Sequence, residues 1–296
     1  MSIQKNYPLV SLIFPVKNEG ENIRKTIDSA FGVRTEYPFE VVIVEDKSTD
    51  GCCDFISSHK EVERIMVIKA NGIGSASARN LGAQKARGQY LIFCDAHVTF
   101  EDLWIEYLLE PIIGGLADIT TPGIASMHKP NVTGYGQTLK KDFTVHWNTE
   151  KKSDPFATPI VCSCCIAMKK DTFQDLGGYD QGFKVWGYND IEISLKAWLF
   201  GYKLFVQPKS KILHLFRKSH PYSVTYSDLY FNMLRTAYSH LNEDRIEKCK
   251  QIAKHADIAR IEKEVLEGNI LKQRKAYFAR RKYDDDWFMN KFGIKF

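Results

Sequence analysis

Asp95 and His97 could together bind a divalent cation, because both directly follow the short apolar run Tyr90–Cys94. Side chains alternate along an extended chain, so these two point to the same side. A carboxylate and an imidazole suit a transition-type ion such as Mn²⁺ better than Ca²⁺, which prefers oxygen ligands. The triplet alone is weak evidence, since an Asp beside a surface His also arises by chance.

Acidic residues follow a second apolar run in the same way, since Glu45 and Asp46 come directly after Phe39–Val44. Short strands that alternate with helices predict an α/β fold, with a Rossmann-like, mainly parallel sheet and helices on both faces. Ligands of such sheets bind beyond the carboxyl ends of the strands, so both acidic positions mark one candidate site. The expected strands are Val10–Val16, Phe39–Val44, Ile65–Ile68, Tyr90–Cys94, Ile119–Thr121, Ile160–Met168 and Leu204–Val206, and the expected helices are Glu21–Phe31, Ala76–Ala86 and Asp190–Phe200.

The chain of 296 residues is long enough for one large domain with an appendage. Lysine and arginine exceed aspartate and glutamate by 41 to 36, which suits an anionic ligand but equally describes an ordinary surface. From about Tyr226 the sequence changes to charged amphipathic helix. We therefore expect an α/β domain over residues 1–225 and a helical C-terminal extension over residues 226–296.

The seven cysteines are an odd number, and several lie in apolar runs, which indicates reduced buried thiols rather than a disulfide framework. The first apolar run ends at Pro15 and is not preceded by a basic segment with a long apolar core. This pattern fits neither a signal peptide nor a membrane span, so we expect a cytoplasmic protein.

Six sequence blocks, in order between about residues 8 and 222, carry a resemblance to a known family. They are VSLIFPVKNEGENI, VVIVEDKSTDG, GSASARN, CDAHV, GGYDQGFKVWGYNDIEISLKAW and ILHLFRKSHPY. The chain resembles the family 2-like glycosyltransferases of the GT-A fold. CDAHV is most similar to the metal motif of the polypeptide N-acetylgalactosaminyltransferases.

The resemblance implies transfer of a sugar from a UDP-sugar to a peptide, protein or glycan acceptor, with no nucleic acid bound beyond the nucleotide. It implies a cofactor, Mn²⁺ or Mg²⁺, held by Asp95, His97 and His214, although a lone histidine such as His214 is otherwise more often a core residue. Arg217, which the resemblance places at the donor, could otherwise lie with Lys218 in an ordinary solvated basic turn. The residues implied to bind the donor are Pro15, Glu19, Asp46, Arg79, Asp95, Arg217, His220 and Tyr222.

Asp190 is the expected catalytic base, with Glu192 as the following acid, because it matches the Asp of the E-D motif in inverting family 2 enzymes. A carboxylate placed opposite the leaving group can take the proton of the acceptor. The polypeptide N-acetylgalactosaminyltransferases have W-G-G-E-N here and retain configuration, whereas this chain has Asn189 in place of their Glu. Inversion is favoured, and a retaining reaction or a non-catalytic nucleotide-sugar-binding scaffold stays open.

Three further residues are candidates for contacts with the sugar or acceptor. Trp186 and Tyr188 could form an aromatic platform, or they could be core aromatics. Asp180 lies in a turn that resembles the acceptor-side loop of the family and could hold a sugar hydroxyl. The basic, aromatic C-terminal segment could contact a membrane surface or form an oligomer, although packing on its own domain is the favoured interpretation.

Overall fold

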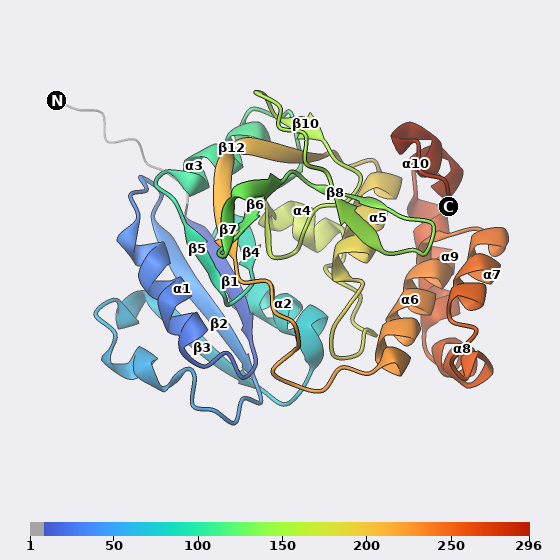
Figure 1. The fold of residues 1–296 in the computed structure, drawn as a ribbon, viewed down its shortest axis with the longest axis horizontal. Helices are drawn as coiled ribbons and strands as arrows, with labels where there is room; N and C mark the ends of the chain where they lie inside the picture. Colours follow the sequence, from blue (N-terminus) through green and yellow to red (C-terminus); the bar gives the residue numbers. More distant parts are fainter. Residues whose placement is uncertain (1–8) are drawn as a thin grey trace.

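A mixed β-sheet forms the centre of the protein, of which this computed structural model describes residues 9–296 (Figure 1). Along the main path, the strands are β10 (Phe156–Ala157), β12 (Leu204–His214), β6 (Ile119–Ser126), β11 (Cys165–Lys169), β4 (Tyr90–Cys94), β1 (Val10–Val16), β2 (Phe39–Asp46) and β3 (Ile65–Ala70). At the margins, β5 (Val98–Phe100) pairs with β12 and β7 (Lys129–Gly134) pairs with β6. A separate hairpin consists of β8 (Gln137–Leu139) and β9 (Val145–Trp147).

Strand direction brings the carboxyl ends of several strands to one edge of the sheet. β3, β2, β1 and β4 run parallel to one another. β11 lies antiparallel between β4 and β6, and β6 runs parallel to β12. β12 therefore points the same way as β1, β2 and β4. This arrangement confirms the predicted α/β fold, and it places Asp46, Asp95 and His214 along one edge.

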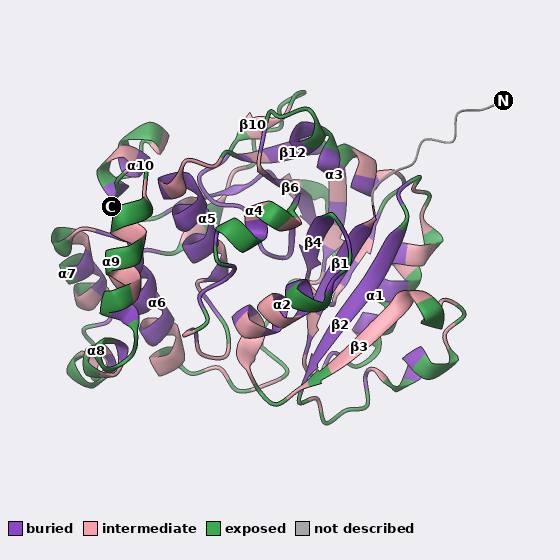
Figure 2. Ribbon diagram, turned by 180° about the vertical axis from the view of Figure 1, so that it is seen from behind, coloured by how far each residue is buried: buried purple, intermediate pink, exposed green. Residues whose placement is uncertain are grey.

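Helices cover both faces of the sheet, as predicted. Alternate residues of β1 enter two different apolar cores, with Leu12 in one and Ile13 in the other. Figure 2 shows β1 and β2 buried, whereas the edge strand β3 is less so. The first core receives α1 (Glu21–Gly32) and α3 (Trp104–Ile113), and the second receives α2 (Gly74–Lys85), α4 (Lys170–Asp175) and α5 (Asn189–Phe200).

Five C-terminal helices lie beside α5, on the right in Figure 1. Their apolar side chains belong to the same core as those of α5. A capping box at Thr225 and Asp228 begins the first of them. The predicted helical extension is confirmed, while its division from the α/β domain at residue 225 stays a prediction. These helices are α6 (Tyr226–His240), α7 (Glu243–Ile252), α8 (Ile258–Glu267), α9 (Ile270–Arg280) and α10 (Asp285–Phe292).

One predicted strand is shorter in the structure. We expected a strand over Ile160–Met168, but β11 begins only at Cys165. The residues before it form a turn, in which the Cys165 N–H donates to the Cys162 carbonyl at 3.0 Å. The apolar side chains of this turn are buried, so its composition is that of a strand although its backbone is not extended.

Across residues 9–296, none of the helices has both the length and the apolar character needed to cross a bilayer. The prediction of a cytoplasmic location rests partly on residues 1–8, which lie outside the described residues. That prediction and the predicted contacts of the C-terminal segment with a membrane or a second copy stay predictions.

Candidate active site

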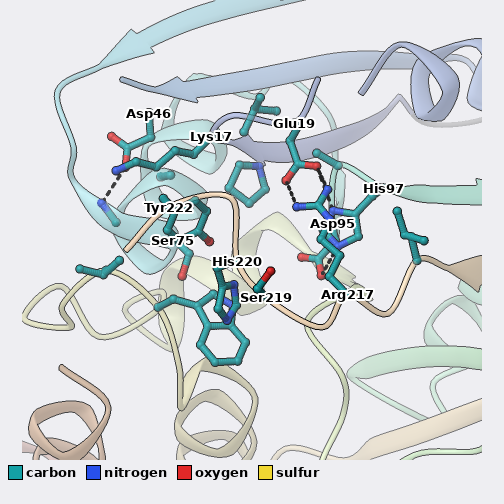
Figure 3. Close-up of a pocket in the computed structure, with 18 of the residues that line it drawn as sticks. Lys17, Glu19, Asp46, Ser75, Asp95, His97, Arg217, Ser219, His220 and Tyr222 are labelled. Atoms are coloured by element: carbon teal, nitrogen blue, oxygen red, sulfur yellow. Dashed lines mark hydrogen bonds and ion pairs between the residues drawn. The ribbon is translucent and has the colours of Figure 1, made fainter. Parts of the chain in front are cut away.

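The carboxyl ends of β1, β2, β4 and β12 border a cavity of about 350 Å³. Figure 3 shows Asp95, His97 and Arg217 gathered at one end of it, with Asp46 and Lys17 at the other. All ten residues predicted to bind the donor or the metal line this cavity, together with Trp186. The ten are Pro15, Glu19, Asp46, Arg79, Asp95, His97, His214, Arg217, His220 and Tyr222.

Strand pairing brings the predicted metal ligands together from distant parts of the chain. His214, the last residue of β12, pairs with Val98, the first residue of β5, so it lies beside His97. The His214 Nε2 lies 3.2 Å from Asp95 Oδ2, and the His97 Nε2 lies 3.9 Å from the same oxygen. One ligand atom from each of the three residues lies within 4.8 Å of the others. A single cation could therefore reach all three.

The chemistry of this cluster fits a divalent cation. The His97 Nδ1 lies 3.2 Å from a Glu19 carboxylate, which can only accept, so on binding a cation His97 would keep its proton on Nδ1 and present the lone pair of Nε2. That lone pair and Asp95 Oδ2 could then bind the same cation. The buried Nδ1 of His214 has no hydrogen-bond partner among the described residues. Imidazole ligands favour Mn²⁺ over Ca²⁺ at such a site.

Asp95 is held in its ionised form. Burial alone would raise the pKa of Asp95, but the hydrogen bond from His214 and the charges of Arg79 and His97 hold it well below its usual range. The Arg79 Nη2 donates to Asp95 Oδ1 at 2.8 Å and to the Ser163 carbonyl at 3.3 Å. Arg79 is buried and forms an ion pair with Asp95.

Asp46 lies at the opposite end of the cavity and fixes the start of α2. Its carboxylate accepts hydrogen bonds from the N–H groups of Ile73 and Gly74 at 2.7 and 2.9 Å. Gly74 has a φ of +81°, and a Cβ there would come within 3.2 Å of the Val185 backbone. Glycine therefore allows α2 to begin directly against the segment that carries Trp186.

The segment after β12 forms another wall of the cavity and presents neutral donors. Burial, with the nearby charge of Arg217, lowers the pKa of His220. Burial, with Asp95 and Glu19, raises the pKa of Tyr222 to about 12. Both side chains are therefore neutral near pH 7, and each can donate a hydrogen bond. The His220 ring lies 4.3 Å from the half-exposed Trp186 ring, measured between ring centres.

Asp190, the predicted base, lies in the first turn of α5, outside the lining of the cavity. Its Oδ1 accepts a hydrogen bond from the Ser163 N–H at 3.1 Å. Burial raises the pKa of Asp190, and the hydrogen bonds from Ser163 oppose that shift only in part. The turn around Ser163 thus contacts both Asp190 and Arg79. The predicted base therefore lies behind the predicted metal ligands, since Arg79 in turn contacts Asp95.

Glu192 lies away from the cavity, although we predicted it beside the base. Its side chain is fully buried, and its Oε1 lies 3.0 Å from the Lys196 Nζ and 3.1 Å from the His240 Nε2. Helical spacing explains the difference, because Glu192 stands two residues beyond Asp190 and so points to another side of α5. Its contacts are those of a buried structural ion pair.

Two predicted substrate residues also lie outside the cavity lining. The Asp180 carboxylate accepts hydrogen bonds from the Arg235 guanidinium, the closest at 2.7 Å, and its side chain is fully buried. Tyr188 has a φ of 64° and packs its ring 5.9 Å from that of Phe143. Both residues therefore connect the loop before α5 to surrounding structure, and only Trp186 of the three faces the cavity.

Sequence reasoning did not identify several polar residues that line the cavity, among them Lys17, Ser75 and Ser219. Lys17 follows β1 as Asp46 ends β2, so its position at the carboxyl end of a strand was a usable signal. Ser75 accepts a hydrogen bond from the Asn189 side chain at 2.7 Å. That contact joins α2 to α5 and is not visible in the sequence.

Comparison with known proteins agrees with this geometry. The sequence model of glycosyl transferase family 2 matches residues 11–177, more than half of the chain. The chain belongs to this family. A second family model, the N-terminal domain of galactosyltransferase, matches residues 145–220 of this family 2 protein. The two matches together cover every predicted metal ligand.

Among its relatives, this family 2 member is 29% identical to the probable N-acetylgalactosaminyltransferase 8 of Caenorhabditis elegans, over 69% of the chain and 54% of that protein. It is 30% identical to polypeptide N-acetylgalactosaminyltransferase 8 of Drosophila melanogaster, over 71% of the chain and 38% of that protein. The chain therefore spans about half the length, or less, of these curated relatives.

Solved structures share the GT-A fold of this chain. A crystal structure of GalNAc-T7 with UDP, GalNAc and Mn²⁺ superimposes with a TM-score of 0.75 at 22% identity, covering 98% of this chain and 57% of that one. The S. aureus TarS fragment 1–349 with UDP-GlcNAc gives a TM-score of 0.60 at 19% identity, covering 82% and 70% of the two chains. At these identities the likeness establishes the fold alone.

Proposed function

We propose that this protein is a metal-dependent glycosyltransferase that moves a sugar from a UDP-sugar to a peptide, protein or glycan acceptor. The observation that carries the proposal is the cluster of Asp95, His97 and His214 in one cavity with Arg217 and with the neutral donors after β12. The named relatives are polypeptide N-acetylgalactosaminyltransferases, and GalNAc-T7 was solved with UDP, GalNAc and Mn²⁺. These names support a UDP-sugar and a peptide acceptor as the first substrates to test.

The two ends of the cavity differ in a way that suits a nucleoside diphosphate. Asp46 and Lys17 lie at the end that would receive the nucleoside, and the metal cluster lies at the other (Figure 3). When bound, a divalent cation would neutralise the diphosphate as its bond to the sugar breaks. Arg217, His220 and Tyr222 would donate hydrogen bonds to the leaving diphosphate, and such donors are most effective where charge develops.

Asp190 is the proposed base, which makes the proposed reaction an inverting one. Burial raises its pKa, and a carboxylate with a raised pKa accepts a proton more readily than an ordinary one does. Asp190 lies behind the cavity wall and accepts a hydrogen bond from the Ser163 N–H. When substrates bind, the acceptor hydroxyl has to replace that N–H as the hydrogen-bond donor to the carboxylate. A retaining reaction is the alternative, and the anomeric configuration of the product, read by NMR, distinguishes the two.

The direct test is turnover of UDP-sugars with and without Mn²⁺. We expect release of UDP from at least one of UDP-GalNAc, UDP-GlcNAc, UDP-galactose and UDP-glucose, and we expect EDTA to abolish it. Adding a serine- and threonine-rich peptide should raise the rate if the acceptor is a peptide. If no UDP-sugar is consumed at millimolar Mn²⁺, the proposed activity is wrong, and binding of a UDP-sugar without turnover would favour a scaffold role.

A further inference from the structure

Glu19 contacts two functional groups at once. Its side chain is 6% exposed, and one carboxylate oxygen lies 3.2 Å from the His97 Nδ1. The Arg217 guanidinium donates to both oxygens, with Nη1 at 3.3 Å from Oε1 and Nη2 against Oε2. Figure 3 shows dashed lines from the Glu19 carboxylate to the Arg217 guanidinium and to the His97 ring. Both of its oxygens are therefore engaged by the protein.

The backbone around Glu19 is fixed from both sides. The N–H of Gly20 donates to Asp50 at 2.8 Å, and the Asn18 side chain accepts from the Thr49 N–H at 2.8 Å. Asn18 and Gly20 both have a φ of 53°, which is a tight turn between β1 and α1. The Glu19 carboxylate is consequently presented from a turn anchored to the segment after β2, and it can orient the groups that contact it.

We propose that Glu19 is a positioning residue with two tasks: it orients His97 for the cation and it holds Arg217 at the diphosphate end of the cavity. Sequence reasoning assigned Glu19 to direct contact with the donor, whereas its engaged oxygens indicate action through other residues. The inference rests on the proposed function, since it assumes that a cation and a diphosphate bind here.

The first task concerns the ring of His97. A carboxylate cannot donate, so Glu19 fixes the proton on Nδ1 and leaves Nε2 as the ligand atom. Such outer partners of metal-binding histidines fix the tautomer and ring orientation, and their removal costs about 10- to 100-fold in metal affinity. His214 has no comparable partner at its Nδ1 among the described residues, so Glu19 supports one histidine ligand selectively.

The second task concerns the segment after β12. Arg217 is one-fifth exposed and stands at the start of a run that carries His220 and Tyr222. Pairing with the buried Glu19 holds the guanidinium over the metal cluster before any anion arrives. If the segment places Arg217 correctly only one-tenth of the time without that ion pair, the apparent Kd for UDP rises about tenfold.

Two variants separate the tasks. Glu19→Gln keeps a carbonyl oxygen that can accept from His97 but removes the charge that pairs with Arg217, while Glu19→Ala removes both. The matched control is Glu21→Ala, two residues away, whose exposed carboxylate pairs with Arg24 at 3.3 Å at the surface. Circular dichroism of each variant verifies that the chain is folded at the assay temperature.

The experiment measures the Kd of Mn²⁺ alone by electron paramagnetic resonance and the Kd of UDP at saturating Mn²⁺ by calorimetry. We expect Glu19→Ala to weaken Mn²⁺ binding about 10- to 100-fold. Glu19→Gln should bind Mn²⁺ at least about fivefold more tightly than the alanine variant, and its UDP affinity should fall about tenfold. Glu21→Ala should match the wild type in both.

Unchanged Mn²⁺ and UDP affinity in Glu19→Ala would overturn this inference alone, provided that the wild type binds both ligands. Equal loss of Mn²⁺ affinity in the alanine and glutamine variants would also overturn it, because the retained acceptor would then have no effect on His97. A wild type that binds neither Mn²⁺ nor UDP would overturn this inference and the proposed function together.

Discussion

Replacing Asp180 with alanine should destabilise the fold and leave the donor site intact. The Asp180 side chain is fully buried, and the Arg235 side chain that pairs with it is 3% exposed. Asp180 also accepts from the Gln273 side chain at 2.8 Å and from the Gly182 N–H at 2.7 Å. The variant would bury the Arg235 charge without its partner, and such a loss costs about 3–5 kcal/mol.

Thermal unfolding followed by circular dichroism measures this cost. For a chain of this length about 1 kcal/mol lowers Tm by about 2 °C, so the expected decrease is about 6–10 °C. The control Asp244→Ala removes an exposed carboxylate in the first turn of α7, and it should cost less than about 1 kcal/mol. The Kd values of UDP and of UDP-GalNAc at saturating Mn²⁺, measured well below Tm, should stay within about threefold of the wild type.

The opposite pattern would refute the structural assignment of Asp180. An unchanged Tm together with a weakened UDP-sugar complex would show that the carboxylate contacts the sugar, as the sequence alone suggested. A large decrease in Tm with unchanged UDP affinity would place Asp180 among the residues that join the loop before α5 to the C-terminal helices.

Three further predictions concern the cavity and the base behind it. Asp190→Asn should lower the rate of sugar transfer by about 10²–10⁴-fold while the Kd of UDP stays unchanged. Because the base must be ionised and burial raises its pKa, the wild-type transfer rate should fall as the pH decreases through that raised pKa. A pH-independent rate together with an active asparagine variant would exclude Asp190 as the base. Asp46→Ala should lose two hydrogen bonds at the start of α2, each worth about 1 kcal/mol in the unfolding free energy, and weaken UDP binding without changing Mn²⁺ affinity. Equal UDP affinity would place the nucleoside elsewhere. Because burial and Arg217 lower the pKa of His220, this side chain should be neutral at both about pH 7 and about pH 8. The ratio of the UDP affinities of the wild type and His220→Ala should therefore be the same at both pH values. A ratio that changes over this range would contradict a neutral donor.

The strands that carry the site were predictable from the sequence because they are buried on both faces. β1 and β4 have the predicted bounds, since runs of apolar residues that end in Pro, Asn or Asp are typical of parallel strands. The ends of β2 and β4 determine where Asp46 and Asp95 lie. The length of β12 was not predictable, because the polar run Lys209–Lys211 interrupts its apolar pattern. The strand nevertheless continues to His214, where it pairs with both β6 and β5.

The roles of isolated acidic residues were harder to predict, because their partners come from remote helices. Asp180 and Glu192 lie in a segment that resembles an active-site motif, yet Arg235 and His240 of α6 pair with them in the core. Nothing in the local sequence indicates that α6 packs there. Asp95 and His97 were predictable for the opposite reason, since both follow closely after the end of β4, whereas His214 was predicted only from the family resemblance.

The most direct test of the account is an anomalous difference map recorded at the manganese absorption edge from crystals soaked with Mn²⁺ and UDP. We expect a single strong peak within coordination distance of Asp95, His97 and His214, with the diphosphate beside it and the uracil toward Asp46. A map with no peak among these three side chains, or with the manganese and UDP bound at another surface, would contradict the account.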